Sequence, residues 1–147
     1  MELEVFKKTF HNYLKERHFK KIKSRYYLKG ENFICEIRLM RSYYGPMYYV
    51  DYMFFLGNLE SPMDIKRGSA ETYTPNVYGR FYFNEKTFYS IEYMDYTEEE
   101  FKAMLDKNFA ERINPPFEEG KQFLLKHLGT LYQTFVGKET VLPLLQD

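Results

Sequence analysis

Apolar residues recur along this chain with two different periods. Over residues 2–17 they are spaced by three or four positions, as in Phe6, Phe10 and Leu14, which predicts an amphipathic helix. From residue 19 the period shortens to two, which predicts strands. The first three expected strands are residues 19–29, 33–43 and 47–56, separated by a turn at 30–32 and a break at Gly45-Pro46. Because these connections are short, we expect an antiparallel meander.

The strand at residues 47–56 is apolar or aromatic on both faces, with Val50 and Tyr52 on one side and Tyr49 and Met53 on the other. A strand with two apolar faces is typical of the middle of a sheet. Residues 57–76 follow it without any periodicity. So long an irregular stretch is uncommon in a compact domain, and it is a lid, a binding loop or a disordered segment.

The second half of the chain begins with strands and continues with helices. Thr97 and Glu100 match the capping box that starts a helix, and the Asn114-Pro115-Pro116 run is expected to end it. Gly129 is expected to kink or split the helical stretch that follows. The expected elements are strands at 77–84 and 88–94 around a hairpin turn at 84–87, a helix from 97 to 114, and a helix over about 117–135.

This order of elements predicts the fold class. One helix, about five strands and two helices along residues 1–147 indicate a single α+β domain. In such a fold the helices pack on one face of an antiparallel sheet. The opposite face then has no predicted cover, although its strands are rich in tyrosine.

Composition restricts the classes of function. The 147 residues carry 21 basic and 21 acidic side chains, which argues against a globally basic nucleic-acid-binding protein. The single cysteine, Cys35, excludes an internal disulfide. No apolar run reaches the length of a membrane span, and the acidic N-terminus does not resemble a signal peptide. We therefore expect a cytoplasmic protein.

One segment resembles a known family. Residues 13–21, Tyr-Leu-Lys-Glu-Arg-His-Phe-Lys-Lys, are followed by the aromatic pair Tyr26-Tyr27, and Met40-Arg41-Ser42 and Tyr49-Val50-Asp51 come later. This arrangement over residues 3–57 is similar to the bacterial DUF4304 family. His18, Met40, Arg41 and Asp51 replace glycine, glutamine, lysine and asparagine of that pattern. The family has no assigned function, so the resemblance implies an order of elements and no catalytic residue.

The aromatic content of 20% motivates the main hypotheses on function. An aromatic sheet face with arginines is typical of a protein interface, so we expect a protein-interaction module that binds a protein partner or forms a homodimer. The alternative is a small-ligand binder or cryptic enzyme, with a pocket between the sheet and residues 57–76 and with Arg38, Arg41 and Asp51 as polar anchors. A third explanation is that the tyrosines only build the core and have no binding role. The candidate residues are Arg38, Arg41, Tyr49, Asp51, Arg80 and Tyr82.

A basic segment supports a weaker alternative. Lys20, Lys21, Lys23 and Arg25 lie close to aromatic residues, and this combination can contact nucleic acid. Lysines on an edge strand also prevent aggregation between sheets, and internal pairing with the acidic helical segment at 98–120 is a third explanation. We favour the last two explanations over nucleic-acid binding.

Catalytic and metal-binding signals are weak. His11 and His18 have no acidic or cysteine partner at a metal-ligand spacing. Cys35 lies on an apolar strand face, as a buried residue would. The acidic runs at 98–100 and 118–119 stand where a helix dipole favours them. We therefore expect neither a metal nor a cofactor, and no catalytic residue is assigned.

Overall fold

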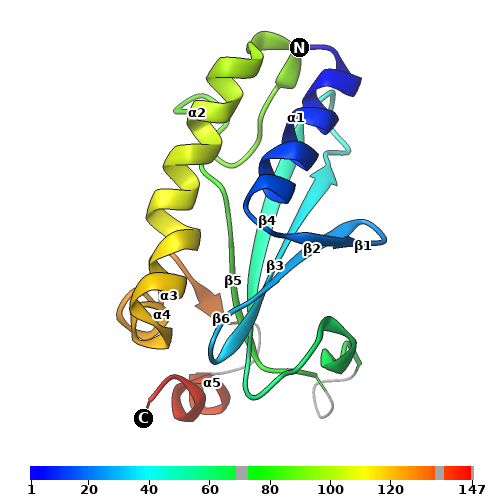
Figure 1. Ribbon diagram of the computed structural model, residues 1–147. Coiled ribbons are helices and arrows are strands. Elements are labelled where there is room, and N and C mark those ends of the chain that lie inside the picture. The colour runs from blue at the N-terminus through cyan, green and yellow to red at the C-terminus, as the bar shows by residue number, and fades with distance from the viewer. Residues whose placement is uncertain (69–72, 135–137, 147) are drawn as a thin grey trace.

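The computed structural model describes residues 1–68, 73–134 and 138–146. It is an α+β fold in which an N-terminal helix precedes an antiparallel sheet and further helices follow (Figure 1). The six strands stand in the sheet in their sequence order. They are β1 (Lys20–Ile22), β2 (Arg25–Lys29), β3 (Phe33–Arg41), β4 (Tyr48–Leu56), β5 (Asn76–Arg80) and β6 (Gln133–Thr134).

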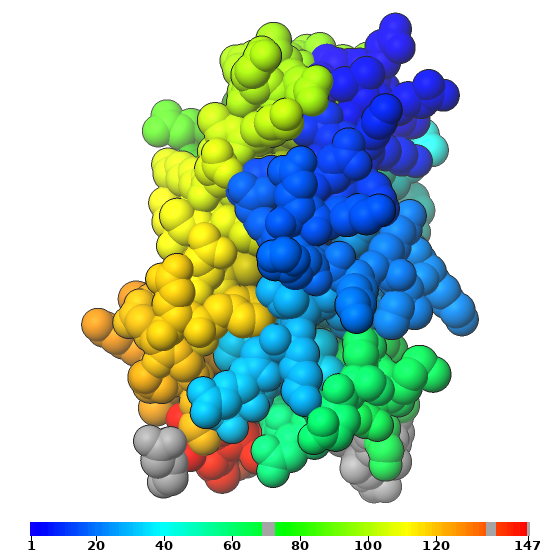
Figure 2. Space-filling view, viewed as in Figure 1, coloured from blue at the N-terminus to red at the C-terminus, as the bar shows by residue number. Residues whose placement is uncertain are grey.

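Helices α1 and α2 lie side by side over one face of the sheet (Figure 1), and Figure 2 shows their side chains in contact. Segments α2, η3 and α3 follow one another directly as a single long helix, in which η3 has the wider π-helical turn. The helices are α1 (Leu3–Glu16), η1 (Pro62–Asp64), η2 (Tyr93–Asp95), α2 (Glu98–Asn108), η3 (Phe109–Ile113), α3 (Asn114–Glu119), α4 (Lys121–Lys126) and α5 (Lys138–Leu145).

The core lies between these helices and the sheet. The predicted stripe of α1 is buried at Phe6, Phe10 and Leu14, and the face of β4 that carries Val50, Tyr52 and Phe54 is buried throughout. The Phe6 ring lies 4.7 Å from the Phe101 ring and 5.3 Å from the Tyr48 ring, measured between centroids. Aromatic pairs at such distances add to the stability that burial itself provides. Much of the aromatic content therefore serves the core.

The opposite face of the sheet is partly covered by the segment between β4 and β5. Ile34 and Phe55 point to this face and are fully buried. The guanidinium of Arg67 lies 5.0 Å from the Phe55 ring. It also forms an ion pair with Glu36, at 3.0 Å between Nη2 and Oε1. Part of the 57–76 stretch therefore packs as a strap on the sheet, while residues 69–72 lie outside the described residues.

Four of the five predicted strands are present in the expected order, although several of their bounds differ. Residues 19–29 form two strands, because Lys23 has φ of 57° and turns the chain. The strand expected at 77–84 ends at Arg80. Residues 88–94 do not form a strand: Ile91 makes an isolated bridge to Tyr48, and 93–95 is the 3-10 helix η2. The turn at 84–87 is confirmed, since Asn84 Oδ1 accepts the Thr87 amide at 2.7 Å.

The helix predicted to end at Asn114-Pro115-Pro116 continues through these residues. The Asn114 amide donates to the Phe109 carbonyl, five residues back, which is the wider turn of a π-helix. The two prolines follow at the first positions of α3 and are buried. A proline has no amide to donate and its ring needs room near the preceding turn. The wider turn accommodates the prolines without ending the helix.

The single helix expected over 117–135 is also wrong, and residues 135–137 lie outside the described residues. Gly120 and Gly129 both have φ of 93°, a conformation that favours glycine. Gly120 separates α3 from α4, and Gly129 lies in the turn that precedes β6. Residues 133–134 therefore extend the sheet as its edge strand beside β5.

Candidate functional site

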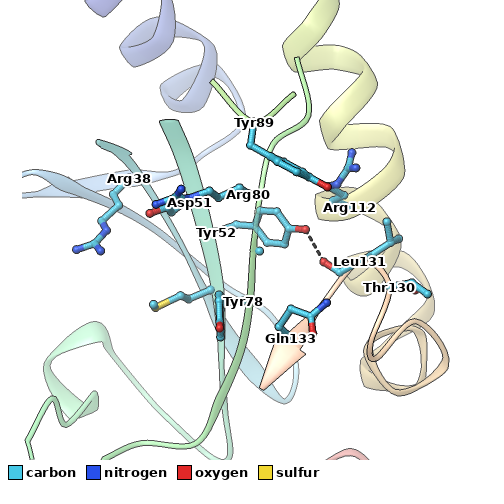
Figure 3. Close-up of a pocket in the computed structure, with 12 residues that line it drawn as sticks. Arg38, Asp51, Tyr52, Tyr78, Arg80, Tyr89, Arg112, Thr130, Leu131 and Gln133 are labelled. Carbon is cyan, nitrogen blue, oxygen red and sulfur yellow. Dashed lines mark hydrogen bonds and ion pairs between the residues drawn. The ribbon is translucent and has the colours of Figure 1, made fainter. Parts of the chain in front are cut away.

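A cavity of about 530 Å³ lies beside β5, at the side of the sheet where β6 pairs (Figure 3). Its walls come from β3, β4 and β5, from β6 and the segment before it, from the segment with Tyr89 and from η3. This size lies within the range of sites that bind small organic molecules. The lining residues are Arg38, Asp51, Tyr52, Met53, Tyr78, Gly79, Arg80, Tyr89, Arg112, Thr130, Leu131 and Gln133.

Gly79 leaves room for a close contact that forms part of the cavity wall. A Cβ atom at position 79 would overlap the Tyr52 hydroxyl and lie 2.8 Å from the Leu131 carbonyl oxygen. In the absence of that atom, the Tyr52 hydroxyl reaches past β5 and donates a hydrogen bond of 2.5 Å to Leu131 O. A glycine within a strand often marks such a close approach. The hydrogen bond fastens the segment before β6 to the sheet and forms part of the cavity wall.

The outer end of the cavity has a row of charged residues. Register places Arg38 opposite Asp51, and Asp51 opposite Arg80, on three neighbouring strands. Arg80 Nε lies 2.7 Å from Asp51 Oδ1, and the Arg80 guanidinium stacks on Tyr49 at 4.3 Å from the ring centroid. Within the described ranges 1–68, 73–134 and 138–146, Arg38 has no ion pair or hydrogen bond from its side chain. Arg80 is therefore balanced and held in place, whereas Arg38 is not.

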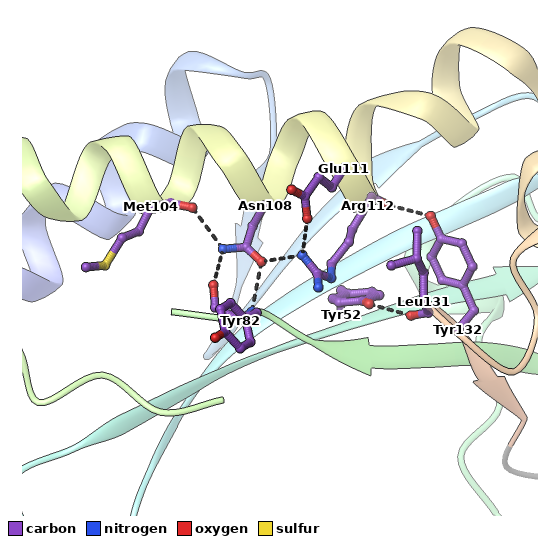
Figure 4. Close-up of polar contacts among 8 residues, drawn as sticks. All are labelled: Tyr52, Tyr82, Met104, Asn108, Glu111, Arg112, Leu131 and Tyr132. Carbon is purple, nitrogen blue, oxygen red and sulfur yellow. Dashed lines mark hydrogen bonds and ion pairs between the residues drawn. The ribbon is translucent and has the colours of Figure 1, made fainter. Parts of the chain in front are cut away.

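Arg112 lies at the helix end of the cavity and is held by a network (Figure 4). Its Nη1 donates to Asn108 Oδ1 at 2.9 Å and forms an ion pair with Glu111 at 3.0 Å. Asn108 is buried, and its amide also donates to the carbonyls of Tyr82 and Met104, each at 2.8 Å. These bonds fix the guanidinium at the cavity, close to the Tyr89 ring as Figure 3 shows.

Burial controls the ionisation of the tyrosines around this wall. Desolvation raises the pKa of Tyr52 well above its usual value, although nearby Arg112 lowers it in part. Desolvation likewise raises the pKa of Tyr132, whose hydroxyl donates to Arg112 O at 2.7 Å. Both phenols therefore stay neutral at physiological pH and act as hydrogen-bond donors to backbone carbonyls.

The structure places three of the six candidate residues, Arg38, Asp51 and Arg80, at the cavity. Tyr49 lies behind Arg80 through its stacking contact. The ring of Tyr82 contacts that of Tyr89 at 6.0 Å between centroids. Arg41 is exposed at the end of β3 and does not line the cavity. The described parts of the 57–76 segment, residues 57–68 and 73–76, contribute no lining residue to this pocket.

The basic segment divides into exposed and paired residues. Lys20 and Lys21 are exposed on the edge strand β1, and Lys23 is exposed in the turn after it. Arg25 Nε instead lies 2.9 Å from the buried Glu36 carboxylate. Three of the four residues thus have the position of lysines that protect a sheet edge. Arg25 instead pairs with Glu36, the same carboxylate that Arg67 of the strap contacts.

Several cavity residues had no signal in the sequence patterns. Tyr89, Arg112, Leu131 and Gln133 are distant from β3 and β4 along the chain and meet them only through the fold. Gly79 within an apolar strand is the one local signal that sequence reading could have used. Tyr52 was placed correctly in the strand, but its hydroxyl contact depends on Gly79 and Leu131 together.

Other candidate chemistry finds no support in the described part of the chain. No group of three potential metal ligands occurs there. His11 Nδ1 lies 2.8 Å from the Tyr26 hydroxyl, and His127 stacks on Phe123 at 4.3 Å. Burial raises the pKa of the Cys35 thiol, which is unfavourable for a nucleophile. Within the same described residues, no helix has both the length and the apolar character needed to cross a bilayer.

Comparison with known proteins finds no match: no family model, no curated protein and no solved structure is similar to this chain. The similarity of residues 3–57 to the DUF4304 family therefore stays a prediction from the residues quoted above.

Proposed function

We propose that this chain binds a small organic molecule in the cavity beside Gly79. The observation that carries the proposal is the cavity itself, about 530 Å³ in volume, with tyrosine, methionine and leucine side chains interspersed with three arginines. A largely apolar pocket with a few convergent polar groups is the usual form of a ligand site. The rigid wall formed by Tyr52 and Leu131 supports the same role.

The strap also supports this choice over a wholly aromatic docking face. Ile34 and Phe55 belong to the outer face but are buried under the chain's own residues. Arg38, Met53 and Tyr78 of the same face are partly exposed and border the cavity. A ligand site of limited size therefore fits the open area better than a broad sheet-to-protein interface.

The test is a screen of small aromatic compounds, neutral and charged, against the whole chain by ¹H–¹⁵N NMR. We expect saturable shifts that are concentrated on the amides of Gly79, Leu131 and Gln133. The variant Gln133→Trp, a change at an exposed position of β6, should fill the cavity and abolish these shifts. Gln146→Trp, exposed and outside the cavity, is the matched control. Binding that is equal in both variants, or no binding at all, would contradict the proposal.

We propose interaction with a protein partner or a second copy as the other candidate function, because exposed aromatics gather near one end of the sheet. Tyr43 and Tyr44 are almost fully exposed in the turn between β3 and β4, and Phe88 and Tyr89 are half exposed. The Tyr48–Ile91 bridge joins their two segments. Native mass spectrometry of the protein from its own source tests this candidate: a dimer or a second protein mass supports it, and a persistent monomer contradicts it.

A further inference from the structure

The cavity carries uncompensated positive charge at its outer end. Among the lining residues that the structure describes, Asp51 is the only carboxylate, and it is already paired with Arg80 at 2.7 Å. The neighbouring Arg38 lines the same wall without an ion pair anywhere in the residues that the structure describes. An arginine in a semi-enclosed site whose neighbouring carboxylate is already paired with another cation attracts an anion, because local solvent cannot screen it fully.

The other arginine of the cavity is less available. Arg112 forms an ion pair with Glu111 and donates to Asn108, so its charge is balanced and its position fixed. The surfaces between the two ends are the apolar side chains of Met53 and Leu131 and the ring of Tyr78. Aromatic and apolar walls of this kind favour a flat apolar body.

We infer, resting on the proposed function, that the ligand is an organic oxoanion, a flat apolar body with a carboxylate or phosphate group, and that Arg38 is the residue that binds this group. The planar fork of a guanidinium can donate two parallel hydrogen bonds to either kind of oxoanion. The Asp51–Arg80 pair sits beside Arg38 and orients the ligand without adding net charge. The apolar body lies toward Leu131 and Tyr78.

A matched pair of fluorescent probes tests the charge requirement directly. 8-Anilinonaphthalene-1-sulfonate and N-phenyl-1-naphthylamine share the same rings and differ only in the sulfonate, which stands in for the oxoanion. Both are titrated into the whole chain, and the Gly79 amide shift in NMR verifies that each probe occupies the cavity. 1-Naphthoate and 1-naphthyl phosphate then compete with the anionic probe and distinguish a carboxylate ligand from a phosphate ligand.

We expect the anionic probe to bind at least about tenfold more tightly than the neutral one, as one charge-assisted contact provides. Arg38→Met should remove this difference and leave the neutral probe unchanged, and Arg38→Lys should keep part of it. Arg41→Met, on the same strand but outside the cavity, is the control and should bind both probes like the parent chain. Melting temperatures establish that each variant is folded.

Each contrary result has a separate meaning. Equal affinity for the two probes, an equal loss of both in Arg38→Met, or no displacement by either naphthyl acid overturns the assignment of Arg38 while the cavity remains a binding site. If neither probe shifts the Gly79 amide and no compound of the wider screen does, the proposed function itself fails.

Discussion

The contact between Arg67 and Glu36 gives the sharpest prediction about stability. Glu36 is 2% exposed, and its Oε1 lies 3.0 Å from Arg67 Nη2 and 2.9 Å from Arg25 Nε. Arg67 Nη2 also donates to the Tyr27 hydroxyl at 2.9 Å. Arg67→Met keeps an aliphatic side chain over Phe55 but removes both polar contacts. The buried carboxylate then has one cation in place of two.

The expected loss in the free energy of unfolding is about 3 kcal/mol, because a hydrogen bond to a charged group contributes about 1.5–3 kcal/mol and a neutral one about 1 kcal/mol. Urea denaturation measures this loss, and hydrogen exchange should show faster opening of residues 58–68. Lys29→Met is the matched control. It breaks the 3.1 Å pair with Glu60, which also joins the strap to the sheet, but this pair is exposed and should contribute less than about 1 kcal/mol.

A double-mutant cycle decides whether the ion pair causes the effect. In a Glu36→Gln background, Arg67→Met should cost less than about 1 kcal/mol, because no buried charge is then left with a missing partner. If the cost of Arg67→Met is the same in both backgrounds, Arg67 acts through packing on Phe55 and the electrostatic reasoning is refuted.

Three further predictions follow from buried polar groups. Burial raises the pKa values of Tyr52 and Tyr132 above the usual 10.0. Their contribution to the free energy of unfolding is therefore complete below pH 10. Above pH 10 only the unfolded state ionises, and each tyrosine lowers the free energy of unfolding by about 1.4 kcal/mol per pH unit. Tyr132→Phe should reduce the slope of an alkaline denaturation profile. Asn108→Ala leaves two carbonyls and Arg112 without their partner and should cost about 3 kcal/mol in urea denaturation. Cys35 should react with a thiol reagent only at the rate of unfolding, since it is fully buried.

The sequence predicts those parts of the fold that depend on local periodicity. The strand predicted at 47–56, with two apolar faces, is β4 (Tyr48–Leu56), which lies inside the sheet between β3 and β5. The two residues of β6 are too few for any period, and they pair because Gly129 turns the chain back toward β5. The prolines at 115 and 116 remain in a helix through a π turn that no pattern signals. Predictions from local sequence patterns fail where a distant contact or an unusual turn determines the backbone conformation.

The candidate site follows the same division. Arg38, Asp51 and Arg80 could be grouped from sequence because neighbouring antiparallel strands place them in one row. Arg112 and Leu131 could not, because their approach depends on the course of the long helix and of the turn after α4. One wall of the cavity, with Arg38, Asp51 and Arg80, therefore follows from the alternation of side chains along the strands. The other wall, with Arg112 and Leu131, forms only through tertiary packing.

The two walls meet at Gly79, so this residue tests how the site is built. Gly79→Ala would place a methyl group against the Tyr52 hydroxyl and 2.8 Å from Leu131 O, which breaks their hydrogen bond and should cost about 1–3 kcal/mol as overpacking. Tyr52→Phe removes the atom that the methyl group meets first. If the close approach forms the cavity wall, Gly79→Ala costs less in the Tyr52→Phe background than in the parent chain. Equal costs in urea denaturation would show that neither the Tyr52 hydroxyl nor its hydrogen bond to Leu131 accounts for the cost of the methyl group.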